Sequence, residues 1–229
     1  MNDIVFIAQS AFIKARSIHD NFLYVRNRAR KFHRTKKPML LFKLDIKKAF
    51  DSVRWDYLMD TLNHHGFPTR FRGWISALLS SASSRVVLNG IAGDPIKHAV
   101  FCAPIKEDVQ FLTATLASFG EPTGLVTNCA KSLVAPIRCE GVDLDDILQS
   151  FPACRSSFPI RYLGLPLAIR RLRRVHLQHL EDKAAGKLAP WRGRHVAIAG
   201  RMTLVKAVLT AVEIYHLTPL DLPMEVSWI

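Results

Sequence analysis

An apolar run that ends in a carboxylate constrains this chain more than any other feature. Met39–Leu44 is almost entirely apolar, and Asp45 follows it at once. Pro38 precedes the run and ends whatever helix comes before it. A short apolar run bounded by a helix breaker predicts a strand over residues 39–45, apolar enough to be central in a sheet. The sequence therefore places one acidic side chain at the end of a buried strand.

A carboxylate in this position is a candidate ligand for a divalent cation. Phosphoryl-transfer sites hold two such ions about 3.5–4 Å apart, and Mg²⁺ prefers oxygen ligands. Asp45 could supply one bridging carboxylate, and the carbonyl of Ile46 another oxygen. Phe50 lies five residues beyond Asp45, where its ring could form the wall of a sugar pocket. On spacing alone, a plain turn or cap aspartate explains Asp45 equally well.

The charge of the chain favours a polyanionic partner. The sequence holds 32 Lys and Arg against 19 Asp and Glu, a net charge of +13. Nucleic acid is the first class of partner that fits, and an anionic membrane surface is the second. No apolar run could span a bilayer and no signal peptide opens the chain, so we expect an intracellular protein of the nucleus or cytoplasm. The four cysteines show no Cys-x-x-Cys spacing, which argues against a zinc site or a disulfide framework.

A basic amphipathic helix is expected over residues 18–34, after a capping-box pattern at Ser17 and Asp20. No acidic residue lies between Asp20 and Asp45. A solvated helix usually mixes the two signs of charge, so this bias favours phosphate contact, with a solvated basic face as the alternative. The candidate nucleic-acid contacts here are Arg26, Arg28, Arg30, Lys31, Arg34, Lys36 and Lys37.

The second half of the chain has the same bias. Between Arg155 and Lys206 the only acidic residues are Glu181 and Asp182. Two basic lobes that flank a carboxylate strand would suit a cleft that grips a duplex. The candidate contacts in this half are Arg170, Arg171, Arg173, Arg174, Arg201 and Lys206.

The remaining pattern mixes helices with short strands, so the class is α+β. Helices are expected over residues 55–65, 69–79, 107–119, 174–189 and 199–216, the third of them stopping at Gly120. Strands are expected over residues 86–88 and 132–137, and interrupted strands over 158–167. We expect core or lobe contacts, rather than base stacking, for Trp55, Trp74, Trp191 and Trp228.

A series of segments, in order along nearly the whole chain, carries a resemblance to a known family. The segments are Gln9–Lys14, Arg16–Asn21, Leu44–Val53, Gly66–Pro68, Ser84–Gly90, Arg161–Leu167 and Gly200–Lys206. In these segments the chain resembles the reverse transcriptase of plant LINE-type (non-LTR) retrotransposons. The resemblance implies synthesis of DNA on an RNA template from a DNA primer, with Mg²⁺ and deoxynucleotides.

The resemblance also implies roles for single residues and for regions. Asp45 would be a catalytic metal ligand, and Phe50 would select deoxyribose by clashing with a 2′-hydroxyl. Lys131 would neutralise or protonate the leaving pyrophosphate, with an ordinary surface lysine as the alternative. The implied architecture is a partial right-hand polymerase, with fingers and N-terminal palm over residues 1–99, the remaining palm over 100–170 and a helical thumb-like part over 171–229.

The chain departs from the family after Gly93–His98. There the family continues with an Arg-Gly-x-Arg-Gln-Gly-Asp-Pro segment and then a Tyr-Ala-Asp-Asp hairpin. This sequence runs directly into Ala99–Asp108, which resembles the family's sequence on the C-terminal side of the hairpin. A central palm segment with its paired aspartates is therefore expected to be missing at about residues 98–100.

Because this segment is missing, we expect the chain to be a remnant of an RNA-directed DNA polymerase that has lost its catalytic activity. One carboxylate cannot hold two divalent ions against their mutual repulsion. The alternatives are a non-catalytic, basic nucleic-acid-binding protein and a non-functional product of a decayed gene. A residual enzyme that recruits Glu107 or Asp108 is a further alternative.

Overall fold

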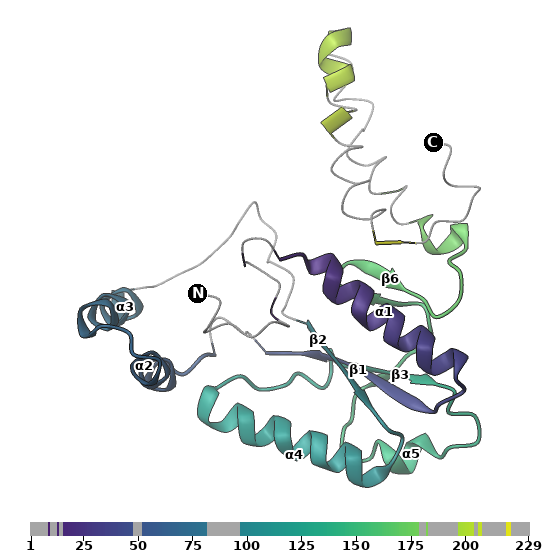
Figure 1. Cartoon of the computed structure of the whole chain (residues 1–229), viewed down its shortest axis with the longest axis horizontal. Coiled ribbons are helices and arrows are strands. Elements are labelled where there is room, and N and C mark those ends of the chain that lie inside the picture. Colours follow the sequence, from purple (N-terminus) through teal and green to yellow (C-terminus); the bar gives the residue numbers. More distant parts are fainter. Residues whose placement is uncertain are drawn as a thin grey trace. The chain divides into compact units, whose positions relative to one another are not determined.

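Helices and strands alternate irregularly along the chain (Figure 1). The structure is a computed structural model that describes residues 9, 13, 16–47, 52–81, 97–178, 182, 197–203, 206–207 and 219–220. Its helices are α1 (Ile18–Arg34), α2 (Trp55–His64), α3 (Thr69–Ser81), α4 (Lys106–Thr123), α5 (Leu144–Ile147) and the 3₁₀ helix η1 (Arg174–His176). Its strands are β1 (Met39–Asp45), β2 (Lys97–Cys102), β3 (Leu133–Ile137), β4 (Cys154–Arg155), β5 (Ile160–Tyr162) and β6 (Leu165–Leu167).

The chain divides into two compact units. Unit 1 comprises Met1–Phe6 and Lys36–Ser156, and unit 2 comprises Ile7–Thr35 and Ser157–Ile229. The division into fingers, palm and thumb-like regions has other boundaries and stays a prediction.

Unit 1 is built on a four-stranded mixed sheet of order β2-β1-β3-β4. Strands β2 and β3 pair antiparallel with β1, one on each side, and β4 pairs parallel with β3. All seven residues of β1 are buried. The predicted central strand over residues 39–45 is thus confirmed at both ends, and Asp45 is its last residue.

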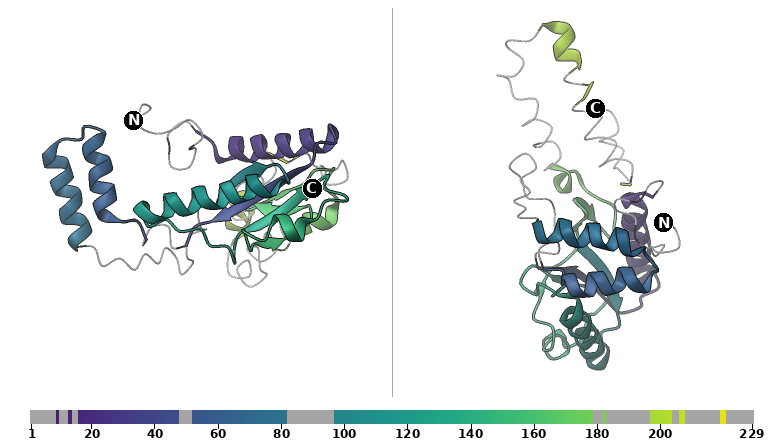
Figure 2. Two further views of the ribbon diagram at one scale, coloured as in Figure 1. Left: turned by 90° about the horizontal axis from the view of Figure 1, so that it is seen from below. Right: turned by 90° about the vertical axis from the view of Figure 1, so that its left-hand side faces the viewer.

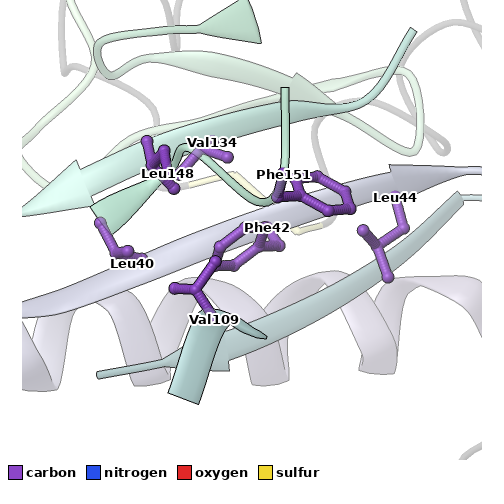
Figure 3. Packing of buried hydrophobic residues seen from close by; sticks show 7 residues of the cluster. All are labelled: Leu40, Phe42, Leu44, Val109, Val134, Leu148 and Phe151. Atoms are coloured by element: carbon purple, nitrogen blue, oxygen red, sulfur yellow. The ribbon is translucent and has the colours of Figure 1, made fainter. Parts of the chain in front are cut away.

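One face of this sheet forms a hydrophobic core with α4 and α5 (Figures 1 and 3). Because side chains alternate between the two faces of a strand, Leu40, Phe42 and Leu44 of β1 all point to this face. Phe42 meets Phe151 edge to face, with ring centroids 5.3 Å apart. Full burial of a side chain of this size contributes about 1.5–3 kcal/mol, so this cluster holds β1 in place.

Helix α4 continues beyond its predicted stop at Gly120 and ends at Thr123. Gly120 is buried inside the helix, whereas Gly124 adopts the left-handed φ of +77° and donates its N–H to the carbonyl of Gly120 at 2.9 Å. A Cβ atom on Gly124 would lie 2.0 Å from the carbonyl oxygen of Ser52. The prediction was wrong because the second glycine, not the first, meets a steric requirement that only glycine satisfies.

Unit 2 contains α1 and the β5–β6 hairpin. Helix α1 begins where predicted, and the Oγ of Ser17 accepts the N–H of His19 at 3.1 Å. The interrupted strands expected over residues 158–167 form an antiparallel hairpin. Leu163 and Gly164 take φ values of +50° and +79° at its turn, as a tight two-residue hairpin requires.

The other predicted elements agree where the structure describes them. Helices α2 and α3 match their predicted ranges to within two residues, and β3 begins one residue later than expected. The strand predicted over residues 86–88 lies outside the described residues. Of the last two predicted helices, the structure describes η1, Gln178, Asp182, residues 198–203 and residues 206–207 as helical.

Candidate functional site

Asp45 ends the central strand of unit 1 and is held there through its backbone. Its side chain and backbone together are only 3% exposed. The Asp45 carbonyl accepts the N–H of Asn128 at 2.7 Å, and the Asp45 N–H donates to the Oγ of Ser132 at 3.0 Å. Within the part of the chain that the structure describes, the Asp45 carboxylate has no salt-bridge partner. The sequence thus delivers a buried carboxylate whose charge requires a partner from elsewhere.

The turn around Lys131 is fixed to the end of β1 by these same contacts. Ser132 donates both its N–H and its Oγ–H to the carbonyl of Asn128, at 2.9 and 2.8 Å, and Lys131 donates its N–H to that oxygen at 3.2 Å. Lys131 itself is exposed. The structure therefore brings the turn that carries Lys131 to the backbone of Asp45.

A second set of backbone contacts extends this junction beyond the strand. Ile46 forms an isolated β-bridge with Thr127, and the N–H of Lys47 donates to the carbonyl of Val126 at 2.9 Å. Since residues 126–128 come just after α4 in the chain, the position of α4 and the position of Asp45 are coupled. Phe50, expected at the sugar pocket, lies outside the described residues.

Sequence reasoning missed two polar residues at this strand. Lys43 is only 9% exposed, and it shares a face of β1 with Asp45 because the two are two residues apart. His98 of β2 lies opposite Leu44 in the strand register, so it is on the other face of the sheet from Asp45, and its partial burial lowers its pKa. The sequence did contain a signal for Lys43, because it is the one charged residue within the apolar run over residues 39–44.

The donor groups near Asp45 do not fit a pair of divalent cations. Among the described residues, no three His, Cys, Asp or Glu side chains lie close enough together to hold a metal ion. Asp45 with the carbonyl of Ile46 supplies one carboxylate and one neutral oxygen. Two cations held about 3.5–4 Å apart need more negative charge than this. The expected Mg²⁺ site is therefore not assembled by the described residues.

The sequence does hold one adjacent pair of aspartates, Asp145 and Asp146, which sequence reasoning also missed. They lie in α5, where Asp143 caps the helix by accepting both of their N–H groups. Asp146 is ion-paired with Lys106, and Asp145 with Arg155 at 2.7 Å. Both are surface ion pairs, since the side chains of Asp145 and Asp146 are exposed.

This aspartate pair and the Glu107–Asp108 pair lie at the opposite end of β1 from Asp45. Leu148, just after α5, packs beside Leu40, as Figure 3 shows. The pKa of Cys102, which is paired with Leu40 in the strand register, is raised by burial and then by the Asp108 carboxylate. Leu40 and Asp45 are five residues apart, about 17 Å along a strand. Neither acidic pair is therefore in position to complete a site with Asp45.

Two arginines of the basic helix α1 are engaged within unit 2. Arg26 is buried, and its guanidinium donates to the carbonyl of Pro219. Arg30 donates its Nε–H to the carbonyl of Ala168 at 3.4 Å. The remaining basic residues predicted to contact nucleic acid in this region are exposed, namely Arg28, Lys31, Arg34, Lys36 and Lys37.

The basic candidates of the second half are described in part. The side chains that the structure describes there are exposed, namely those of Arg170, Arg171, Arg173, Arg201 and Lys206. Arg174 begins η1. Both units thus expose basic residues.

Two of the tryptophans are not core residues, so the expectation of core contacts was wrong for them, and lobe contacts stay a prediction. Trp55 is 51% exposed and Trp74 is 57% exposed. Trp191 and Trp228 lie outside the described residues. The helices that carry Trp55 and Trp74 bury only part of their surface, and α2 has no buried residue at all.

Comparison with known proteins assigns the region around Asp45. Residues 3–102 match the family model described as "Reverse transcriptase (RNA-dependent DNA polymerase)". The sequence of these residues is thus similar to that of reverse transcriptases. They include β1, Asp45 and the whole of β2.

A similar protein comes from a transposon. The chain is 31% identical over 87 residues to the "Transposon TX1 uncharacterized 149 kDa protein" of Xenopus laevis. This similarity spans 38% of the chain and 7% of the Xenopus protein. The chain is therefore related to a small part of a much longer transposon protein.

None of the described helices is both long enough and apolar enough to cross a membrane.

Proposed function

We propose that this chain is a remnant of the RNA-directed DNA polymerase of a plant-type non-LTR retrotransposon. The observation that carries the proposal is the position of Asp45. It ends a buried central strand inside the region of reverse transcriptase sequence, and the turn that bears Lys131 is bonded to its backbone. In the proposed parent enzyme, Asp45 would be a metal ligand, Phe50 would select deoxyribose and Lys131 would act on the leaving pyrophosphate.

We further propose that the chain has lost polymerase activity. The support is that no three His, Cys, Asp or Glu side chains among the described residues lie close enough together to hold a metal ion, while Asp145 and Asp146 form ion pairs at the other end of β1. Two-ion phosphoryl transfer draws several kcal/mol of transition-state stabilisation from its metals. Loss of one half of the ligand set would remove most of this transition-state stabilisation.

The retained function would then be binding of nucleic acid, with an RNA template and DNA primer as the ancestral partners. The support is the net charge of +13 together with exposed basic residues on both units. The logarithm of the affinity should fall linearly with the logarithm of the salt concentration. Lack of cooperative unfolding would instead favour the alternative of a chain without function.

The test of the catalytic proposal is primer extension on an RNA template with Mg²⁺ and deoxynucleotides, comparing the natural chain with Asp45→Asn. We expect no extension from either protein, in samples that unfold cooperatively. Extension by the natural chain that disappears in Asp45→Asn would overturn the loss of catalysis and show that another carboxylate completes the site. Extension by both proteins alike would indicate a contaminating polymerase, which a repeat with protein purified through a second tag would remove.

A further inference from the structure

Helix α3 carries an exposed face that combines aromatic and basic side chains. Trp74 is 57% exposed, Phe71 is 36% exposed, and Arg70 is exposed beside them. With 3.6 residues per turn, these residues and Leu78, which is 63% exposed, fall within a sector of about 100° around the helix axis. We call Arg70, Phe71 and Trp74 the α3 aromatic face.

The other side of α3 is partly buried and carries a different set of residues. Arg72, Ile75 and Leu79 are half-buried and have the spacing i, i+3 and i+7. Helices α2 and α3 lie side by side in both Figures 1 and 2. The packing of α3 thus uses residues other than those of the α3 aromatic face, which remains open to a ligand.

The side chains of the α3 aromatic face are already ordered by contacts among themselves. The guanidinium carbon of Arg70 lies 5.1 Å from the centroid of the Trp74 ring. Phe71 stacks on Phe67 with ring centroids 5.2 Å apart and an interplanar angle of 25°. Fixed rings lose little conformational entropy when a flat ligand stacks on them.

The charge of this helix complements a phosphate backbone. Helix α3 contains Arg70 and Arg72 and no acidic residue. The neighbouring α2 contributes Asp56 and Asp60, of which Asp56 is ion-paired with Arg54. Exposed aromatic rings interleaved with arginines are the combination with which proteins bind unpaired nucleotides, stacking the bases and neutralising the phosphates.

We propose that the α3 aromatic face is a binding site for single-stranded nucleic acid. A base stacks on the open part of the Trp74 indole, and a flanking phosphate contacts the exposed Arg70 guanidinium. This inference deepens the proposed function and rests on its nucleic-acid partner. It is independent of Asp45 and of whether the chain polymerises.

The test measures binding of a fluorescent oligothymidylate of about 20 nucleotides to the full chain by anisotropy. Trp74→Ala should raise the Kd about 5- to 150-fold, because stacking on one aromatic side chain is worth about 1–3 kcal/mol per base. Trp74→Phe keeps a ring and should retain most of the affinity. Trp55→Ala is the matched control, since Trp55 is also about half exposed but lies on α2 beside Asp56.

The outcomes separate this inference from the function on which it rests. Unchanged affinity in Trp74→Ala, or an equal loss in Trp55→Ala, overturns the site while duplex binding stays intact. Failure of the natural chain to bind any duplex in a salt-dependent way overturns the nucleic-acid partner itself. If Trp74→Ala altered the self-association of the chain in sedimentation but left oligothymidylate binding unchanged, the face would bind a second copy of the chain, and the proposal would be overturned. Unchanged thermal unfolding of the variants, expected for a surface residue, shows that the fold is not the cause.

Discussion

At the scale of single residues, the junction that holds Asp45 depends on one hydroxyl. Strand β3 begins at Leu133, which pairs with Lys43, so no β3 carbonyl is opposite Asp45. The Oγ of Ser132 takes that place by accepting the Asp45 N–H. Ser132 is 1% exposed, so water cannot substitute for it. The side chain of Ser132 thus prolongs the hydrogen-bonding of the sheet by one residue.

Ser132→Ala should therefore destabilise unit 1. The substitution leaves the buried Asp45 N–H without an acceptor, and an unsatisfied buried donor costs about 1–3 kcal/mol. Ser118→Ala is the matched control, because the Ser118 hydroxyl also donates to a backbone carbonyl but is exposed on α4. Its effect should stay within about 0.5 kcal/mol. Urea unfolding measures both, and a Ser132→Ala cost no larger than that of Ser118→Ala would contradict this role.

At the scale of elements, the end of α4 fixes the segment that comes after β1. The Arg54 N–H donates to the Thr123 carbonyl at 2.9 Å, and Gly124 touches the Ser52 carbonyl closely enough to exclude a Cβ. Gly124→Ala should consequently be much more damaging than Gly66→Ala. Both glycines have a left-handed φ, +77° and +74°, but a Cβ on Gly66 would meet nothing within 4 Å.

The two substitutions separate backbone strain from steric contact. Gly66→Ala should cost about 1–2 kcal/mol, the strain of the left-handed conformation alone. In Gly124→Ala the new Cβ must also displace the Ser52 carbonyl oxygen, which would otherwise lie 2.0 Å away. The free energy of unfolding of this variant should therefore be lower than that of Gly66→Ala. Equal losses for the two variants in urea unfolding would mean that the segment around Ser52 moves away from α4 at little cost.

The elements also show what the sequence could and could not predict. The strand ending at Asp45 and the start of α1 at Ser17 were predictable because apolar runs and caps act over a few residues. The end of α4 was not, since the choice between Gly120 and Gly124 depends on Ser52, which is distant in sequence. For the same reason the contact between the Lys131 turn and Asp45 was not predicted, although the family resemblance implied a role for Lys131.

At the scale of the whole molecule, the described basic residues divide into those that are ion-paired or buried and those that are exposed to solvent. Arg54, Lys106 and Arg155 are ion-paired with aspartates, although they belong to the same net charge of +13. Arg26 is buried within unit 2. The overall count of basic residues, which the sequence provides, therefore overstates the number available to phosphate groups. Three exposed residues of α1, namely Arg28, Lys31 and Arg34, have no acidic neighbour in the helix sequence after Asp20.

The salt dependence of duplex DNA binding distinguishes the two kinds. Changing Arg28, Lys31 and Arg34 together to Gln should lower the slope of log K against log salt by roughly 2 to 3, because each phosphate contact contributes about 0.9. The matched control changes Arg54, Lys106 and Arg155 to Gln and removes the same formal charge. Surface ion pairs contribute little to stability, so this control should still fold, and it should keep the slope of the natural chain. If the two triple variants lose the same slope, binding responds to net charge alone, and α1 is a solvated basic helix with no specific place in the complex.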